Sequence, residues 1–256
     1  MGRVRRPGVE PHMAPDLRNI RIVLVEPEGS FNIGSVARIM NNKGMEDLAL
    51  VNPVDLHEND DAYRAAVGAR ELLERAAVFQ NLPDALRDTN LVVGTTRRAG
   101  KLRRLFCSVE ELPERVFPVT QEGRAAILFG REKDGLTTQE TDLCNILVNI
   151  PAHEDFPSLN LSHAVAVVCY KLYVEAMVYR VPYIERPAPN AEIEGLLDYI
   201  QSVFADMGFF TKGSSRYVIP LFRKIFGRAL LDEEEVQNLT HIFHRLHGLF
   251  KENKAE

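Results

Sequence analysis

A polar cluster over 32–38 (NIGSVAR) follows the first apolar run of the chain and holds residue types suited to binding an anion. Asn32 is expected to cap the N-terminus of a helix, and Gly34 allows another backbone to approach closely. An arginine side chain stays protonated in proteins, so Arg38 either holds a phosphate through its planar guanidinium or forms a surface ion pair. Taken alone, this cluster favours the surface ion pair, with the phosphate contact as the alternative.

Two further clusters follow later apolar runs. Residues 129–136 (FGREKDGL) place Gly130 directly after an apolar run and before a polar turn, so that backbone amides are exposed to a small ligand. Residues 150–160 (IPAHEDFPSLN) include Ser158 and Asn160, either of which suits the cap of the next helix. Each cluster alone also fits an ordinary loop or cap. Three together indicate a ligand site, because α/β sheets build their sites from loops at strand ends.

The elements that position these clusters alternate between short β-branched runs and helical patterns. Strands are predicted at 20–25, 48–51, 91–95, 125–129 and 146–150. Helices are predicted at about 33–42 and 160–178, the second from apolar residues spaced three and four apart. The strand runs are continuously apolar, as in strands covered by helices on both faces, so the expected class is α/β with a largely parallel sheet.

A proline-rich segment, RVPYIERPAPN, ends this pattern because its three prolines cannot continue a helix. Beyond it the pattern is purely helical, with helices expected at about 191–207, 217–227 and 232–250. The predicted organisation is a flexible basic tail (1–17), an α/β domain (18–180), a linker (181–190) and a helical C-terminal domain (191–256).

Composition narrows the classes of protein. The 256 residues carry a net charge of −5 with 45% hydrophobic residues, which excludes general disorder. No apolar run is long enough to cross a membrane, and the three cysteines form no disulfide or metal pattern, so a cytoplasmic protein without a metal is expected. The glycine fingerprints GxGxxG and GxxxxGK[ST] are missing, which disfavours a dinucleotide-dependent oxidoreductase or a nucleotide hydrolase.

The three clusters, in this order, resemble the motifs NxGxxxR, FGxExxGL and SLN of the TrmH-like class of the SPOUT superfamily of RNA methyltransferases. The resemblance covers residues 18 to 178. Within this class, IRIVLVE (20–26), VNP (51–53), VVGT (92–95) and the C-terminal helices look most like the TrmJ family.

The resemblance implies transfer of a methyl group from S-adenosylmethionine to a ribose 2′-hydroxyl of tRNA, on the cytidine or uridine that opens the anticodon loop. It also implies an obligate homodimer, a parallel sheet ending in a C-terminal trefoil knot, and no metal. Two alternatives stay open: the same chemistry on ribosomal RNA, and a non-catalytic RNA-binding protein that keeps the fold.

The resemblance also implies roles for individual residues. The catalytic residues are Arg38 and Ser158, supported by Asn32 and Glu132. The cofactor pocket involves Thr95, Thr96, Arg97, Gly130, Ile150, Ser158, Leu159 and Asn160. Arg38 would stabilise the developing alkoxide and clamp a neighbouring phosphate, and a role as general base stays open.

A basic run, RRAGKLRR (97–104), lies beside the expected cofactor loop. Such a run is often only a solvated surface, but at a strand end next to the site it favours RNA binding, since phosphate contacts supply most non-specific affinity. The expected RNA contacts are Arg38, Arg97, Arg98, Lys101, Arg103 and Arg104.

Overall fold

The computed structural model describes residues 15–54, 58–97, 105–178, 187–210 and 215–254. Its centre is a seven-stranded sheet in the order β3-β2-β1-β6-β4-β7-β5, with every neighbouring pair parallel. The strands are β1 (Ile20–Val25), β2 (Asp47–Val51), β3 (Ala77–Phe79), β4 (Leu91–Thr95), β5 (Leu105–Ser108), β6 (Ala125–Phe129) and β7 (Ile146–Asn149). The expected α/β class with a parallel sheet is confirmed, and the sequence missed only β3 and β5.

Successive residues of the strands pack into two separate cores, one on each face of the sheet. In β1, Ile20, Ile22 and Leu24 belong to the larger core, while Val23 and Val25 belong to the smaller one. All five side chains are at most 2% exposed, which explains why the strand reads as continuously apolar.

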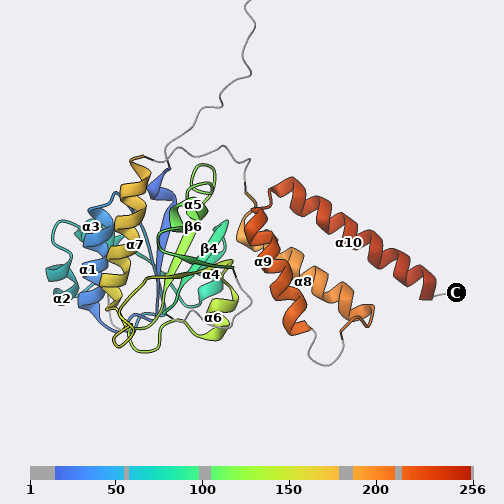
Figure 1. Ribbon diagram of the computed structural model, residues 1–256, viewed down its shortest axis with the longest axis horizontal. Helices are drawn as coiled ribbons and strands as arrows, with labels where there is room; N and C mark the ends of the chain where they lie inside the picture. The colour runs from blue at the N-terminus through green and yellow to red at the C-terminus, as the bar shows by residue number, and fades with distance from the viewer. Residues whose placement is uncertain (1–14, 55–57, 98–104, 179–186, 211–214, 255–256) are drawn as a thin grey trace, which may run out of the picture.

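Seven helices of the sheet domain lie in the described ranges: α1 (Ser30–Asn41), α2 (Asp60–Ala65), α3 (Arg70–Glu74), α4 (Leu82–Leu86), α5 (Leu112–Val116), α6 (Thr138–Asp142) and α7 (Leu161–Ala176). Buried residues of α1, α5 and α7 contribute to the larger core, and those of α4 to the smaller. Figure 1 shows α1 and α7 side by side on one face. Gly34 lets α1 approach α2, because a Cβ there would lie 2.1 Å from the Ala62 carbonyl oxygen.

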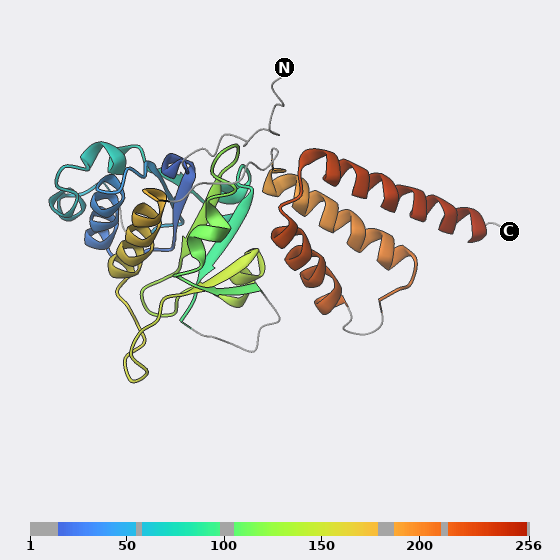
Figure 2. The same ribbon diagram turned by 45° about the horizontal axis from the view of Figure 1, so that its top comes forward.

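The C-terminal extension consists of α8 (Asn190–Asp206), α9 (Ser215–Ala229) and α10 (Glu233–Lys254). It has its own core, which includes the fully buried Leu197 and Ile200 as well as Phe226 and Phe243. Figures 1 and 2 both show it set apart from the sheet domain, as expected for a small helical unit.

The extension contacts the sheet domain through a small joint. The Asn90 side chain donates a hydrogen bond to the Pro187 carbonyl, and the Asn190 amide donates to the Thr89 carbonyl. On α9, a Cβ at Gly227 would lie 2.7 Å from Cβ of the buried Asn145. Part of the expected linker, 181–186, lies outside the described residues, but 187–190 belong to this joint.

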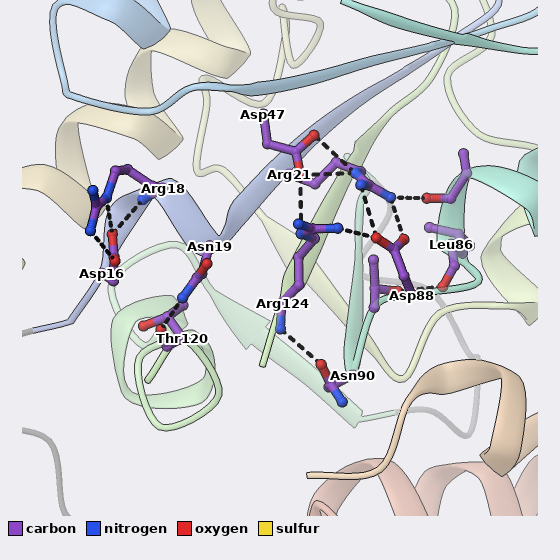
Figure 3. A network of polar contacts seen from close by, with 12 residues as sticks. Asp16, Arg18, Asn19, Arg21, Asp47, Leu86, Asp88, Asn90, Thr120 and Arg124 are labelled. Atoms are coloured by element: carbon purple, nitrogen blue, oxygen red, sulfur yellow. Dashed lines mark hydrogen bonds and ion pairs between the residues drawn. The ribbon is translucent and has the colours of Figure 1, made fainter. Parts of the chain in front are cut away.

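A network of ion pairs adjoins the joint at the amino-terminal edge of the sheet (Figure 3). Arg21 on β1 is 7% exposed and pairs with Asp47 at 3.0 Å and Asp88 at 2.6 Å. Arg124 also pairs with both aspartates. Burial acts to raise the pKa of Asp88, but the contacts with Arg21 and Arg124 outweigh burial and hold this pKa below its ordinary value. Breaking one member would leave a poorly compensated buried charge.

The sheet domain begins slightly before the expected boundary. Leu17–Asn19 form a 3-10 turn, and Leu17 packs against the larger core although the sequence places it in the tail. Residues 1–14 of that tail lie outside the described residues. None of the described helices is long and apolar enough to span a membrane.

Candidate functional site

A pocket lies at the carboxyl ends of β4, β6 and β7 and reaches the start of α7. It is lined by Thr95, Thr96, Arg97, Phe129, Gly130, Arg131, Glu132, Lys133, Asp134, Gly135, Leu136, Ile150, Pro157, Ser158, Leu159, Leu161 and Ala164. The three expected clusters therefore do not contribute equally: the second and third line the pocket, whereas no residue of 32–38 does.

Most of the residues expected to bind a cofactor lie in this pocket. Thr95, Thr96, Arg97, Gly130, Ile150, Ser158 and Leu159 all line it, and so does the expected catalytic partner Glu132. Asn160 does not line it and instead caps α7, where its side-chain oxygen accepts from the Ser162 amide at 2.9 Å. Of the two possible caps, Ser158 and Asn160, the structure therefore uses Asn160.

The wall formed by β4 is fixed by bonds to its neighbours. Thr95 Oγ1 donates to the Leu128 carbonyl at 2.8 Å, and the Thr96 amide donates to the Val148 carbonyl at 2.9 Å. The Asn149 side chain donates to the Thr96 carbonyl at 3.0 Å. These bonds join the ends of β4, β6 and β7, so the pocket stands on a rigid edge.

The loop after β6 folds back on itself at Gly130. A Cβ at Gly130 would lie 2.1 Å from the Gly135 carbonyl carbon and 2.2 Å from the Leu136 nitrogen, so only glycine fits. Gly135 has φ +70°, a left-handed conformation that also favours glycine. Both glycines of the second cluster therefore shape the loop.

A chain of side-chain hydrogen bonds connects the three clusters. Asn160 Nδ2 donates to Asn32 Oδ1 at 3.1 Å, and Asn32 Nδ2 donates to Glu132 Oε1 at 2.9 Å. Glu132 Oε2 accepts from the Glu28 amide at 3.0 Å. Residues 100 and more positions apart in the sequence are thus held in one line, which we name the Asn160–Asn32–Glu132 chain.

The expectation that Asn32 caps α1 is wrong. The helix begins at Ser30, with Gly29 at the cap position, so Asn32 lies within the first turn. The side-chain nitrogen and oxygen of Asn32 are instead both hydrogen-bonded within the Asn160–Asn32–Glu132 chain. A side chain that bridges two loops cannot be distinguished from a cap by sequence spacing alone, because both require a small polar residue at a helix start.

Arg38 is exposed on α1 and does not line the pocket. Within the described residues no carboxylate forms an ion pair with it, so the ion-pair alternative has no partner there. It follows Asn32 by six residues, which places it about 9 Å further along the helix axis.

Among the basic residues of 97–104, Arg97 is exposed and lines the pocket. The other expected RNA contacts in this run, Arg98, Lys101, Arg103 and Arg104, lie outside the described residues.

Sequence reasoning missed the role of Arg131. Its guanidinium donates to Glu26 at 2.8 Å and to both oxygens of Glu140, at 3.0 and 2.9 Å. Hydrogen bonds to Glu140 and Glu26 raise the pKa of Arg131 above its ordinary value, and the bond from Arg131 lowers that of Glu26. The sequence around Arg131 does not indicate this pairing, because Glu26 lies 105 residues away along the chain.

Residues 19–170 match the model of the SpoU rRNA Methylase family. The tRNA (cytidine-2′-O-)-methyltransferase TrmJ of Methanocaldococcus jannaschii is 33% identical over 228 residues, covering 88% of this chain and 98% of that protein. The tRNA (cytidine/uridine-2′-O-)-methyltransferase TrmJ of Sodalis glossinidius is 35% identical over 238 residues, covering 87% and 89%. The crystal structure of TrmJ from Z. mobilis ZM4 has a TM-score of 0.74 and 29% identity, covering 88% and 98%.

Proposed function

The chain belongs to the SpoU rRNA methylase family, and from this premise we propose that it transfers a methyl group from S-adenosylmethionine to a ribose 2′-hydroxyl of tRNA in the cytoplasm. The observation that carries the proposal is the Asn160–Asn32–Glu132 chain, which draws the three motif loops together beside the pocket. A methyl-transfer site needs such fixed loops, because the acceptor oxygen, the methyl carbon and the leaving sulfur must lie nearly in line.

The residues of the pocket fit S-adenosylmethionine. Phe129, Leu136, Ile150, Leu159 and Leu161 supply apolar surface for an adenine ring. At Gly130 the backbone packs tightly against residues 135 and 136 of its own loop, and residues 130–136 line the pocket, where their main-chain groups can contact a ligand. The same pocket contains the cation Arg97, which suits a ligand carboxylate. When bound, the sulfonium of S-adenosylmethionine supplies an activated methyl group.

The protein must also hold the ribose and activate its 2′-hydroxyl. Both oxygens of Glu132 are used within the Asn160–Asn32–Glu132 chain and at the Glu28 amide, so Glu132 positions the loops and does not serve as a free base. Ser158 lines the pocket and is assigned to the ribose side of it. Arg38 stabilises the developing alkoxide and holds the adjacent phosphate, because arginine side chains stay protonated in proteins.

Arg38 does not line the pocket of its own chain, so this role places it at the pocket of a partner subunit in a proposed homodimer. The exposed side of α7 and its C-cap carry an apolar stripe of Val167, Tyr170, Val174 and Met177, which are 38%, 60%, 37% and 59% exposed. Exposed apolar side chains on one side of a helix suit an interface, and α7 lies next to α1, which bears Arg38. We assign the stripe to the dimer contact and Arg38 to the site beside it.

The proposed substrate is tRNA, at the cytidine or uridine that opens the anticodon loop. The family match ends at residue 170, whereas the TrmJ relatives match 87–88% of this chain, so the similarity to tRNA enzymes extends beyond the family match. Ribosomal RNA is the second candidate, since the family is named for it. The proposed trefoil knot would form where the loops after Gly130 and Ile150 meet, and it stays a prediction.

The experiment is methyl transfer from labelled S-adenosylmethionine to unmodified tRNA and to ribosomal RNA, with wild type and Arg38→Ala. We expect label in tRNA for the wild type alone, while Arg38→Ala still binds S-adenosylmethionine within a few-fold in calorimetry. Label in ribosomal RNA only would make ribosomal RNA the substrate in place of tRNA. Label in neither would favour the non-catalytic RNA-binding protein.

A further inference from the structure

Arg131 lines the pocket and is held by several side-chain hydrogen bonds. It lies on the loop after β6, and its side chain is only 18% exposed. All three nitrogens of its guanidinium are engaged: Nε with Glu26, Nη1 with Glu140 and the Gly135 carbonyl, and Nη2 with Glu140. Four of its five N–H donors are directed at the protein in this way, so this arginine is held mainly by the fold.

Its partners come from separate segments of the fold. Glu26 directly follows β1 and has φ +47°, so the chain makes a sharp turn there. Glu140 belongs to the first turn of α6, where it also forms a capping box with Thr137. The Thr137 amide donates to Glu140 Oε2 at 2.7 Å. Arg131 therefore ties the end of the pocket loop to a strand end on one side and to a capped helix start on the other.

The loop between these ties is also closed by its own backbone. The Gly135 amide donates to the Arg131 carbonyl at 3.0 Å, and the two residues form an isolated antiparallel bridge. Residues 130–136 all line the pocket. The hydrogen bonds of Arg131 to Glu26 and Glu140 therefore fix where the backbone amides and carbonyls of this loop lie.

We propose that Arg131 is a positioning residue that sets the cofactor-binding shape of loop 130–136 through Glu26 and Glu140. This rests on the proposed function, since it assumes that the pocket binds S-adenosylmethionine. Arginine is required because its planar fork engages both oxygens of Glu140 while Nε reaches Glu26, an arrangement that lysine cannot reproduce.

The test measures binding of S-adenosylmethionine by calorimetry and thermal unfolding without ligand, for the full chain. Arg131→Met is expected to weaken binding about tenfold or more, and Arg131→Lys to restore little of it. Arg124→Met is the matched control, because it removes an arginine that also bridges two carboxylates, Asp47 and Asp88, but at the opposite edge of the sheet. It should lower the unfolding temperature and leave the affinity within twofold.

A double-mutant cycle separates positioning from direct contact. If Arg131 acts through Glu140, Arg131→Met changes the affinity for S-adenosylmethionine much less in a Glu140→Gln background than in the wild type. Equal effects in both backgrounds would overturn the proposal, and so would an Arg131→Met affinity within twofold of wild type. If Arg131→Met does not fold, Glu26→Gln tests one tie alone and should weaken binding several-fold. Wild type that binds no S-adenosylmethionine would instead refute the proposed function.

Discussion

Asn160 performs two tasks that substitution can separate. Its side-chain oxygen caps α7 by accepting from the Ser162 amide at 2.9 Å and the Ser162 hydroxyl at 2.7 Å. Its side-chain nitrogen donates to Asn32 at 3.1 Å and so starts the Asn160–Asn32–Glu132 chain. Asn160→Ala removes both, whereas Asn160→Asp keeps the cap and removes the donor.

The magnitudes follow from these contacts. Loss of a cap costs about 1 kcal/mol and loss of an exposed hydrogen bond about 0.5–1 kcal/mol, so Asn160→Ala should destabilise the protein by about 1–2 kcal/mol. For a domain of this size that corresponds to a fall of about 2–8 °C in Tm. Asn160→Asp should stay close to the wild-type Tm, because aspartate caps as well as asparagine and its charge at the helix N-terminus, worth about 0.3–1 kcal/mol, offsets the lost hydrogen bond to Asn32.

Activity should follow a different order. In Asn160→Asp a carboxylate faces the Asn32 oxygen, the chain breaks, and methyl transfer to tRNA should fall about tenfold or more from misplaced loops. The assays are thermal unfolding followed by circular dichroism and transfer of labelled methyl groups at saturating cofactor. A normal transfer rate in Asn160→Asp would refute the role of the chain, and an unchanged Tm in Asn160→Ala would refute the cap.

Three further outcomes are expected. Gly227→Val should displace α9 from Asn145, because an added Cβ would lie only 2.7 Å from Asn145, and small-angle scattering should show an altered extension while S-adenosylmethionine affinity is unchanged. An unaltered scattering profile would contradict this joint. Burial raises the pKa of Cys107 to about 11, so at pH 8 a thiol reagent should label it only after unfolding, and rapid labelling of the native protein would show that it is accessible. The bond from Arg131 holds the pKa of Glu26 below its ordinary value of 4.5, so Glu26 stabilises the fold above that pH and less as the pH falls through its folded-state pKa. Denaturant titrations below about pH 5 should show a shallower loss of stability in Arg131→Met, and parallel curves would contradict the tie.

Much of the fold could be predicted because the sheet is buried on both faces. Continuous apolar runs gave β1, β4 and β6 with the bounds that the structure has. β3 has only three residues at a sheet edge, and β5 directly follows a strongly basic run, so neither shows an apolar run long enough to stand out.

The site was predictable where motif residues meet the pocket through their own loop, as Gly130 and Ser158 do. It was not predictable where a role depends on a partner far along the chain. Asn32 suited a cap as well as a bridge to Glu132, and only the fold decides between them. Arg131 resembled a solvated loop charge until Glu26 and Glu140 were brought beside it.

The proposed methyl transfer is tested by locating the methyl group on the RNA. Unmodified tRNA is incubated with the protein and S-adenosylmethionine, digested with nucleases and analysed by mass spectrometry. We expect one 2′-O-methylated cytidine or uridine at the first nucleotide of the anticodon loop, absent from the Arg38→Ala reaction. A methyl group on a base, or a ribose methyl that Arg38→Ala still installs, would contradict it.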